Sequence, residues 1–154
     1  MIAQIFGLLR GFGVQIKTKA SDESVTSSTT LQNDDDLSFT VGAGETWVAR
    51  WCISATFLAT GGAKVAVSVP AGGASMVIAR LEVDVNGFAG KPSSEGAAVN
   101  LVGDGSDAFG FIFVDATVVN GATPGTVNLQ WAQTTSSGTA TVFKANSSLV
   151  ARKK

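Results

Sequence analysis

The chain has 154 residues, which is the size of a single domain. Its formal net charge is −1, and only 15% of its residues are charged, against about 25% in ordinary soluble domains. Because it has no His and a single Cys, the sequence excludes Ser-His-Asp and Cys-His nucleophile pairs, imidazole metal ligands and intramolecular disulfides. A surface so poor in charge needs hydroxyl and amide groups or burial against partner subunits. The composition therefore favours an assembly protein.

The first sixteen residues differ from the rest, so we expect an N-terminal apolar arm over 1–16 and one domain over 17–154. The arm has no basic residue before its apolar run and no cleavage site after it, and the run is far shorter than the ~20 residues that span a bilayer. A signal peptide and a membrane partner are therefore not predicted. Two interpretations remain open: the arm docks on a neighbouring copy, or it packs on its own core. In the first, the contacts are its large apolar residues: Ile2, Ile5, Phe6, Leu8, Leu9 and Phe12.

Asp34, Asp35 and Asp36 come next and directly precede an alternating run, Leu37–Val41. A metal site, acid/base chemistry and a strand entrance are the three interpretations. Asp side chains hydrogen-bond to nearby backbone groups and favour turns, so we expect the entrance to a strand.

Charge is also unevenly distributed along the chain. Residues 21–45 contain acids and no base, whereas both ends are basic. This pattern suits head-to-tail contacts between copies, although two solvated tails explain it equally well. The residues of such a contact would be Asp34, Asp35, Asp36, Arg152, Lys153 and Lys154.

Alternation of apolar and polar residues dominates the chain after the arm. Val65, Val67 and Val69 share one face of a run, and Val77, Ala79, Leu81, Val83 and Val85 share one face of the next. Phe109, Phe111 and Phe113 line one side of a later run. Val127, Leu129 and Trp131 do the same in the last long run, with Asn128, Gln130 and Gln133 facing out. Such alternation is typical of half-buried strands.

Turn residues separate these runs, for example Gly42-Ala43-Gly44 and Pro70-Ala71-Gly72-Gly73. The runs number about eight, are spaced eight to twelve residues apart, and have no strong helical periodicity between them. The sequence therefore predicts an all-β fold, an antiparallel β-sandwich or jelly roll of about eight strands, with an extended N-terminal arm.

Aromatic and sulfur-containing residues have two interpretations each. Trp47, Trp51 and Trp131 suit a sugar-stacking platform or the core, and their spacing along strand faces favours the core. Cys52 suits a reactive thiol or a small core residue, and the scarcity of basic neighbours favours the core.

Residues 86–107 are rich in Gly and Ser and are expected to form a long loop, either functional or disordered. The acids that suit a glycan hydrolase are Asp34–Asp36, Glu82, Asp84, Asp104 and Asp107. General acid catalysis needs one carboxyl with a raised pKa, and neighbouring aspartates on a solvated turn do not provide it. No enzyme, cofactor or metal is predicted. No nucleic-acid partner is predicted either, since no basic stripe alternates with aromatic residues.

Three stretches resemble a structural module of tailed-bacteriophage virion proteins. They are "KTKASDESVTSSTTLQNDDDLSFTVGAGETW" at 17–47, "SVPAGGASM" at 68–76 and "GTVNLQWAQTTSSGTATVFKANSSLVARKK" at 125–154. The resemblance covers most of 17–154, weakens over 86–107 and omits the first sixteen residues. Ala145-Asn146-Ser147-Ser148 stands where the module has Ala-Gly-Ser. The matching motifs contain no catalytic residues.

This resemblance implies a non-enzymatic component of the virion. The first expectation is a capsid decoration or cement protein on the capsid surface, a homotrimer that binds the major capsid protein. The alternative is a tail-fibre or receptor-binding module whose contact surface is the 86–107 segment, with Phe88, Lys91 and Glu95.

Overall fold

The computed structural model describes residues 13–57, 61–83, 87–94, 98–101 and 108–154. Twelve strands run through these residues: β1 Val14–Thr18, β2 Glu23–Val25, β3 Gln32–Val41, β4 Thr46–Phe57, β5 Ala63–Ser68, β6 Ala74–Val83, β7 Gly87–Ser94, β8 Val99–Leu101, β9 Ala108–Val119, β10 Gly125–Ala132, β11 Thr141–Phe143 and β12 Ser148–Lys153. The residues of the predicted arm contact, Ile2 to Phe12, lie outside this described part.

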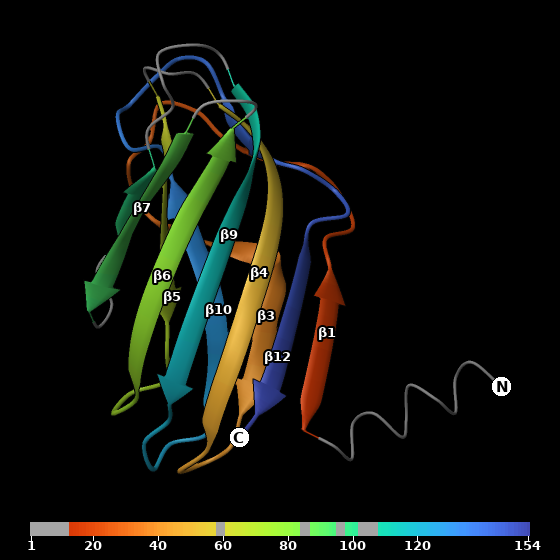
Figure 1. The fold of residues 1–154 in the computed structure, drawn as a ribbon, viewed down its shortest axis with the longest axis vertical. Coiled ribbons are helices and arrows are strands. Elements are labelled where there is room, and N and C mark those ends of the chain that lie inside the picture. Colours follow the sequence, from red (N-terminus) through yellow and green to blue (C-terminus); the bar gives the residue numbers. More distant parts are fainter. Residues whose placement is uncertain (1–12, 58–60, 84–86, 95–97, 102–107) are drawn as a thin grey trace, which may run out of the picture.

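The strands form two antiparallel sheets packed face to face (Figure 1). The larger sheet has eight strands, six of them in the order β1-β12-β4-β9-β6-β7, with β11 pairing both β4 and β2. The smaller sheet has the order β3-β10-β5-β8. This confirms the predicted all-β antiparallel sandwich, and the described residues contain no helix. β1 begins at Val14, so the last three residues of the 1–16 segment pair with β12.

The expected number of about eight strands is wrong. β2, β8 and β11 have three residues each, too short for alternation to reveal. β7 and β8 also lie inside the 86–107 segment that was expected to be a loop. Glycine and serine depress strand propensity, yet neighbouring strands can still pair through the backbone, as β7 does with β6.

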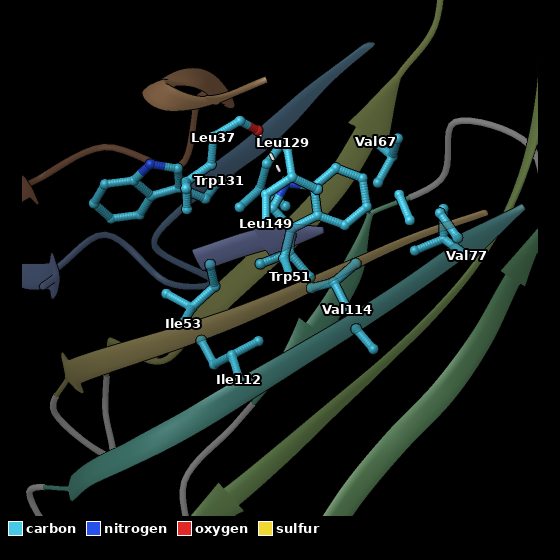
Figure 2. Close-up of a cluster of buried hydrophobic side chains, with 14 of the residues drawn as sticks. Leu37, Trp51, Ile53, Val67, Val77, Ile112, Val114, Leu129, Trp131 and Leu149 are labelled. Atoms are coloured by element: carbon cyan, nitrogen blue, oxygen red, sulfur yellow. Dashed lines mark hydrogen bonds between the residues drawn. The ribbon is translucent and has the colours of Figure 1, made fainter. Parts of the chain in front are cut away.

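The core lies between the sheets and includes all three tryptophans. Trp51 is fully buried, and its indole N–H donates to the Leu37 carbonyl at 2.9 Å, which joins β4 of the larger sheet to β3 of the smaller (Figure 2). Trp131 stacks on Phe143 with ring centroids 4.0 Å apart, and Trp47 is 4% exposed. The core assignment of Trp47, Trp51 and Trp131 is therefore confirmed.

The side that Phe111 and Phe113 share in β9 is the outer face, because the strand buries Ile112 and Val114. Two other assignments of residues are wrong. Gln133 is fully buried instead of facing out. Cys52 is half-buried on the outer face of β4, because its neighbours on the strand, Trp51 and Ile53, occupy the core face.

Candidate interaction surfaces

The three aspartates belong to β3, which starts at Gln32 and not at Leu37. Ser38 pairs with Asn128 and Asn33 pairs with Gln130, so residues 34–37 stand opposite Leu129 alone. This is a bulge, where a strand leaves its regular ladder.

The bulge is held by the first aspartate of the run. Asp34 Oδ1 accepts hydrogen bonds from the backbone N–H groups of Asp36, at 3.0 Å, and Leu37, at 2.9 Å. The expected hydrogen bonding of an aspartate to nearby backbone is confirmed, within a strand rather than before one.

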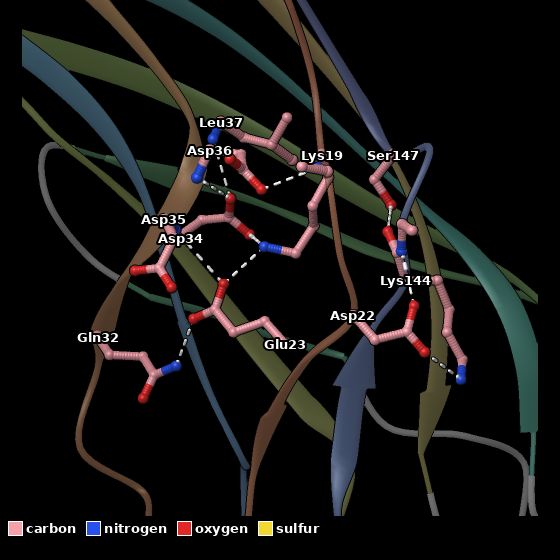
Figure 3. A network of polar contacts seen from close by, with 12 residues as sticks. Lys19, Asp22, Glu23, Gln32, Asp34, Asp35, Asp36, Leu37, Lys144 and Ser147 are labelled. Carbon is pink, nitrogen blue, oxygen red and sulfur yellow. Dashed lines mark hydrogen bonds and ion pairs between the residues drawn. The ribbon is translucent and has the colours of Figure 1, made fainter.

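A buried ion-pair network surrounds this bulge (Figure 3). Lys19 Nζ lies 2.6 Å from Glu23 Oε2 and 2.9 Å from Asp34 Oδ2, and the side chains of Lys19 and Asp34 are 1% and 0% exposed. Burial alone lowers the pKa of Lys19, but the hydrogen bonds to Glu23 and Asp34 outweigh it, so the pKa is raised. The network ties the link between β1 and β2 to β3.

Asp34 is therefore engaged inside its own chain and is not accessible to another copy. Asp36 is half-buried and accepts a hydrogen bond from the backbone N–H of Ala20 at 3.0 Å. Asp35 is exposed. A contact of Asp35 or Asp36 with a neighbouring copy stays a prediction.

The three C-terminal bases are all exposed, and Lys153 also has a partner in its own chain: its Nζ lies 2.7 Å from Glu45 Oε1. Glu45 also accepts hydrogen bonds from the Gly42 backbone N–H at 2.7 Å and the Trp47 indole at 2.8 Å. The pKa of Glu45 is lowered to about 2, chiefly by the hydrogen bond from Lys153 and then by those from Gly42 and Trp47. A role for Arg152, Lys153 and Lys154 between copies stays a prediction.

The outer face of the larger sheet is unusually apolar. Large apolar side chains on it alternate along their strands with buried neighbours, and Met76 is 60% exposed. The register places Ile16 beside Val150. The exposed large apolar residues of the described chain all lie on this face: Ile16, Met76, Ile78, Phe111, Val119 and Val150.

Charged residues cross the middle of the same face. Arg50 Nε lies 2.6 Å from Asp115 Oδ1, and an Arg80 guanidinium nitrogen lies 3.6 Å from Asp115 Oδ2. The Arg80 guanidinium carbon also stands 5.8 Å from the centre of the Phe113 ring. Among the described side chains, exposed Arg152 is a third arginine on this face, beside Asp115 as the acid.

The outer face of the smaller sheet is polar in contrast. Its described residues include Asn33, Ser38, Thr40, Lys64, Ala66, Ser68, Asn100, Thr126, Asn128, Gln130 and Ala132. Ala66 and Ala132 are the apolar members of this set and are 1% and 0% exposed. Among the described residues, the sandwich therefore has one polar face and one apolar face with arginines on it.

The apolar face was not predicted from the sequence, although the sequences of two strands contain a signal for it. "ASMVIARLEV" in β6 and "AFGFIFVDATVV" in β9 have apolar residues at both odd and even positions. A strand of an antiparallel sheet that is apolar on both sides buries one side and needs cover for the other.

A groove runs between β1 and β3, the strands at one edge of each sheet. Its volume is about 860 Å³, and it is lined by Gly13 and β1 on one side and by residues 38–42 on the other. Glu45, Trp47, Thr126 and Lys153 complete the lining.

Within the described part of the chain, no group of three or more Asp, Glu, Cys or His residues could hold a metal ion. No helix there is long and apolar enough to cross a membrane. The side chains of Phe88, Lys91 and Glu95, and those of Glu82, Asp84, Asp104 and Asp107, lie outside the description.

No protein-family model matches the chain, and no curated protein matches it. Among solved structures, the chain is similar to the tripod from the baseplate of bacteriophage Tuc2009, with 10% identity and a TM-score of 0.37 over 91% of this chain and 62% of that one. It is also similar to the infectious bursal disease virus VP2 subviral particle, with 12% identity and a TM-score of 0.28 over 91% of this chain and 40% of that one. The chain spans less than two thirds of either protein. At these TM-scores neither likeness bears on function.

Proposed function

We propose that the chain is a non-enzymatic virion structural protein that decorates a phage capsid, with the outer face of the larger sheet against the shell. The asymmetry of the sandwich is the observation behind this proposal: Met76, Ile78 and their exposed apolar neighbours all occupy one face. In the proposal, the partners are the major capsid protein and further copies of the chain, as a homotrimer.

The chemistry of the face suits a protein partner. Fully burying a large apolar side chain contributes about 1.5–3 kcal/mol, so six half-exposed ones provide several kcal/mol. Arginine is enriched at protein interfaces, and the described side chains of this face include Arg50, Arg80 and Arg152. The expected partner surface is apolar with scattered carboxylates.

Two described carboxyl groups, those of Asp22 and Glu45, are in a state that does not suit a general acid. The pKa of Asp22 is lowered by the backbone N–H of Ala145 and by Lys144, and that of Glu45 is lowered to about 2. A general acid at neutral pH needs a raised pKa instead. These acids bind backbone and cations of their own chain.

The test is co-sedimentation of purified variants with particles that lack the protein. Met76→Glu with Ile78→Glu should reduce binding at least tenfold, because two charges would be buried against the shell. The matched control, Asn128→Glu with Gln130→Glu, places the same charges at the same spacing on the polar face and should bind like the wild type. Both variants should keep the circular dichroism spectrum and thermal midpoint of the wild type.

Equal binding by the two double variants would rule out the apolar face as the contact. Immunogold labelling of whole virions then separates the capsid surface from the tail, which is the alternative location. Gold on the tail would contradict decoration of the capsid.

A further inference from the structure

β1 is the last strand at one side of the larger sheet and pairs with β12 alone among the described strands. Figure 1 shows it at the margin of the sheet, beyond β12. Its other side lines the groove towards β3. Strand edges of this kind present unpaired N–H and C=O groups to another chain.

The hydrogen-bond phase of β1 shows which groups these are. Lys153 N–H donates to the Gly13 carbonyl, and Lys19 N–H donates to the Ser147 carbonyl, each at 2.7 Å. In an antiparallel ladder, residues alternate between pairs that exchange hydrogen bonds and pairs that do not. Gly13, Lys19 and every second residue between them therefore face β12. The backbone groups of Val14, Ile16 and Thr18 face the opposite, open side.

The edge of β3 across the groove is closed by a side chain. Gln15 Nε2 donates to the Thr40 carbonyl at 2.6 Å, and Gln15 Oε1 accepts from the Thr40 N–H at 3.1 Å. The Gln15 amide thus occupies both backbone groups of Thr40, as a paired strand would. Among the described residues, no hydrogen bond closes the outward backbone groups of Val14, Ile16 and Thr18 in this way, so this edge is open to a further strand.

We propose that the open edge of β1 accepts residues 1–12 of a second copy as an added antiparallel or parallel strand. This proposal rests on the proposed function, which requires contacts between copies, and it names the site of one such contact. Backbone hydrogen bonds from Val14, Ile16 and Thr18 would hold the added strand, as in other cases of strand addition to a sheet edge.

The occupant follows from the length and the position of the segment. Twelve residues extend up to about 40 Å, whereas the five residues of β1 span about 17 Å. The segment is long enough to leave its own domain and still cover the edge of another. It also departs from Gly13, which lines the groove, so each copy donates an arm beside the edge at which it accepts one.

Composition fits as well. The segment has large apolar residues on both sides of an extended chain, such as Ile5 and Phe6. On one side of β1 the groove is lined by Trp47, Phe39 and Val41, and on the other side Ile16 and Val150 are exposed. An added strand would cover the exposed Ile16 side chain, whereas Trp47, Phe39 and Val41 are already at most 4% exposed. The chain's own arm is the alternative occupant, and the test separates the two.

The first experiment blocks the edge in the full-length chain. Ile16→Pro removes an N–H that faces the open side, so the internal ladder keeps its hydrogen bonds, and proline is tolerated at such positions. Ile16→Thr is the matched control, because it removes the apolar side chain and keeps the N–H. In sedimentation velocity, Ile16→Pro should be at least tenfold weaker in self-association than the wild type, and Ile16→Thr should stay within about threefold.

A third variant checks the phase of the ladder. Lys17→Pro removes an N–H that faces β12 and should lower the thermal midpoint, whereas Ile16→Pro should leave it within a few degrees. If Ile16→Pro lowers the midpoint as much as Lys17→Pro, the derived open side is wrong and the proposal falls.

The second experiment identifies the occupant by cross-linking. In a Cys52→Ser background, one chain has Phe6→Cys and a second, isotopically heavy chain has Ile16→Cys; the two are mixed, equilibrated and treated with a short bifunctional maleimide. A light–heavy cross-link between the arm and β1 is the expected result. A cross-link that forms solely when both substitutions are in one chain assigns the edge to the chain's own arm and overturns the proposal.

No cross-link in either arrangement, or wild-type association of Ile16→Pro, also overturns it. Both experiments use purified protein without particles, so they fail independently of capsid decoration.

Discussion

At the scale of single residues, the Lys19–Asp34 pair joins separate segments of the chain. It joins the chain after β1 to the β3 bulge, and Asp34 uses its second oxygen to fix two backbone N–H groups. Both side chains are shielded from water, so each charge depends on the other. A buried ion pair adds little compared with a well-packed apolar pair, but breaking it leaves an uncompensated charge.

Replacing Lys19 with Met should therefore lower the free energy of unfolding by about 3–5 kcal/mol. Urea titration followed by tryptophan fluorescence measures this change. The control is Lys17→Met on exposed Lys17, which should cost less than about 0.5 kcal/mol. Adding Asp34→Asn to Lys19→Met should recover part of the loss, since the unpaired charge is then gone. Equal stability of the two lysine variants would contradict the importance of the pair.

Sequence reasoning found the local role of the aspartates but not this lysine. Asp34 was predictable because an aspartate reaches the N–H groups of the residues that follow it. Lys19 was not, because its partners Glu23 and Asp34 lie 4 and 15 residues away and meet it through the fold alone. The burial of Gln133 was not predicted either. Its amide oxygen accepts from the Ser28 and Ser137 N–H groups and its amide nitrogen donates to the Thr139 carbonyl, and the fold brings these groups around it.

At the scale of elements, the alternation of apolar and polar residues was sufficient to identify the core face of β10 but not that of β9. In β10, Val127 and Leu129 alternate with amides, so one face is clearly the core side. In β9, Phe111 and Ile112 are both apolar, and a shift of one residue exchanges the faces. Packing against β4 decides between them, with Ile112 opposite Ile53 on the core side.

Glu45 links three elements: the turn after β3 through Gly42, its own strand β4 through Trp47, and β12 through Lys153. Its pKa of about 2 lies below the ordinary value of 4.5. Between these values the unfolded chain binds a proton at Glu45 and the folded chain does not. Falling pH therefore favours unfolding, and the contribution present above pH 4.5 is lost as pH approaches 2.

The prediction is that Glu45→Gln removes this part of the pH dependence. Because the Lys153 side chain is 45% exposed, solvent screening limits the ion pair to about 1 kcal/mol or less. The difference in unfolding free energy between wild type and Glu45→Gln, from urea titrations, should shrink between pH 5 and pH 2.5. A difference that is constant over this range would show that the Glu45 contacts do not depend on its charge.

At the scale of the whole molecule, the two ends of the chain meet inside one sheet. β12 is not an edge strand: it lies between β1, near the start of the described chain, and β4. Its Leu149 and Ala151 enter the core, whereas Val150 belongs to the apolar outer face. The place of β1 in the larger sheet therefore depends on its pairing with β12. Because β12 occupies one side of β1, the other side is the open edge.

Leu149→Ala should accordingly cost about 2–5 kcal/mol of unfolding free energy, as at a central core position, although it lies six residues from the end. Val150→Ser, one residue on and facing outward, should cost about 0.5 kcal/mol or less and is the matched control. Urea titration of both variants makes the comparison on one strand with one backbone. If Leu149→Ala were as mild as Val150→Ser, β12 would be a peripheral tail, and β1 would lose the partner that fixes its open side. A large difference instead means that the six residues of β12 complete the core with one face. Their other face then remains available for the proposed capsid contact.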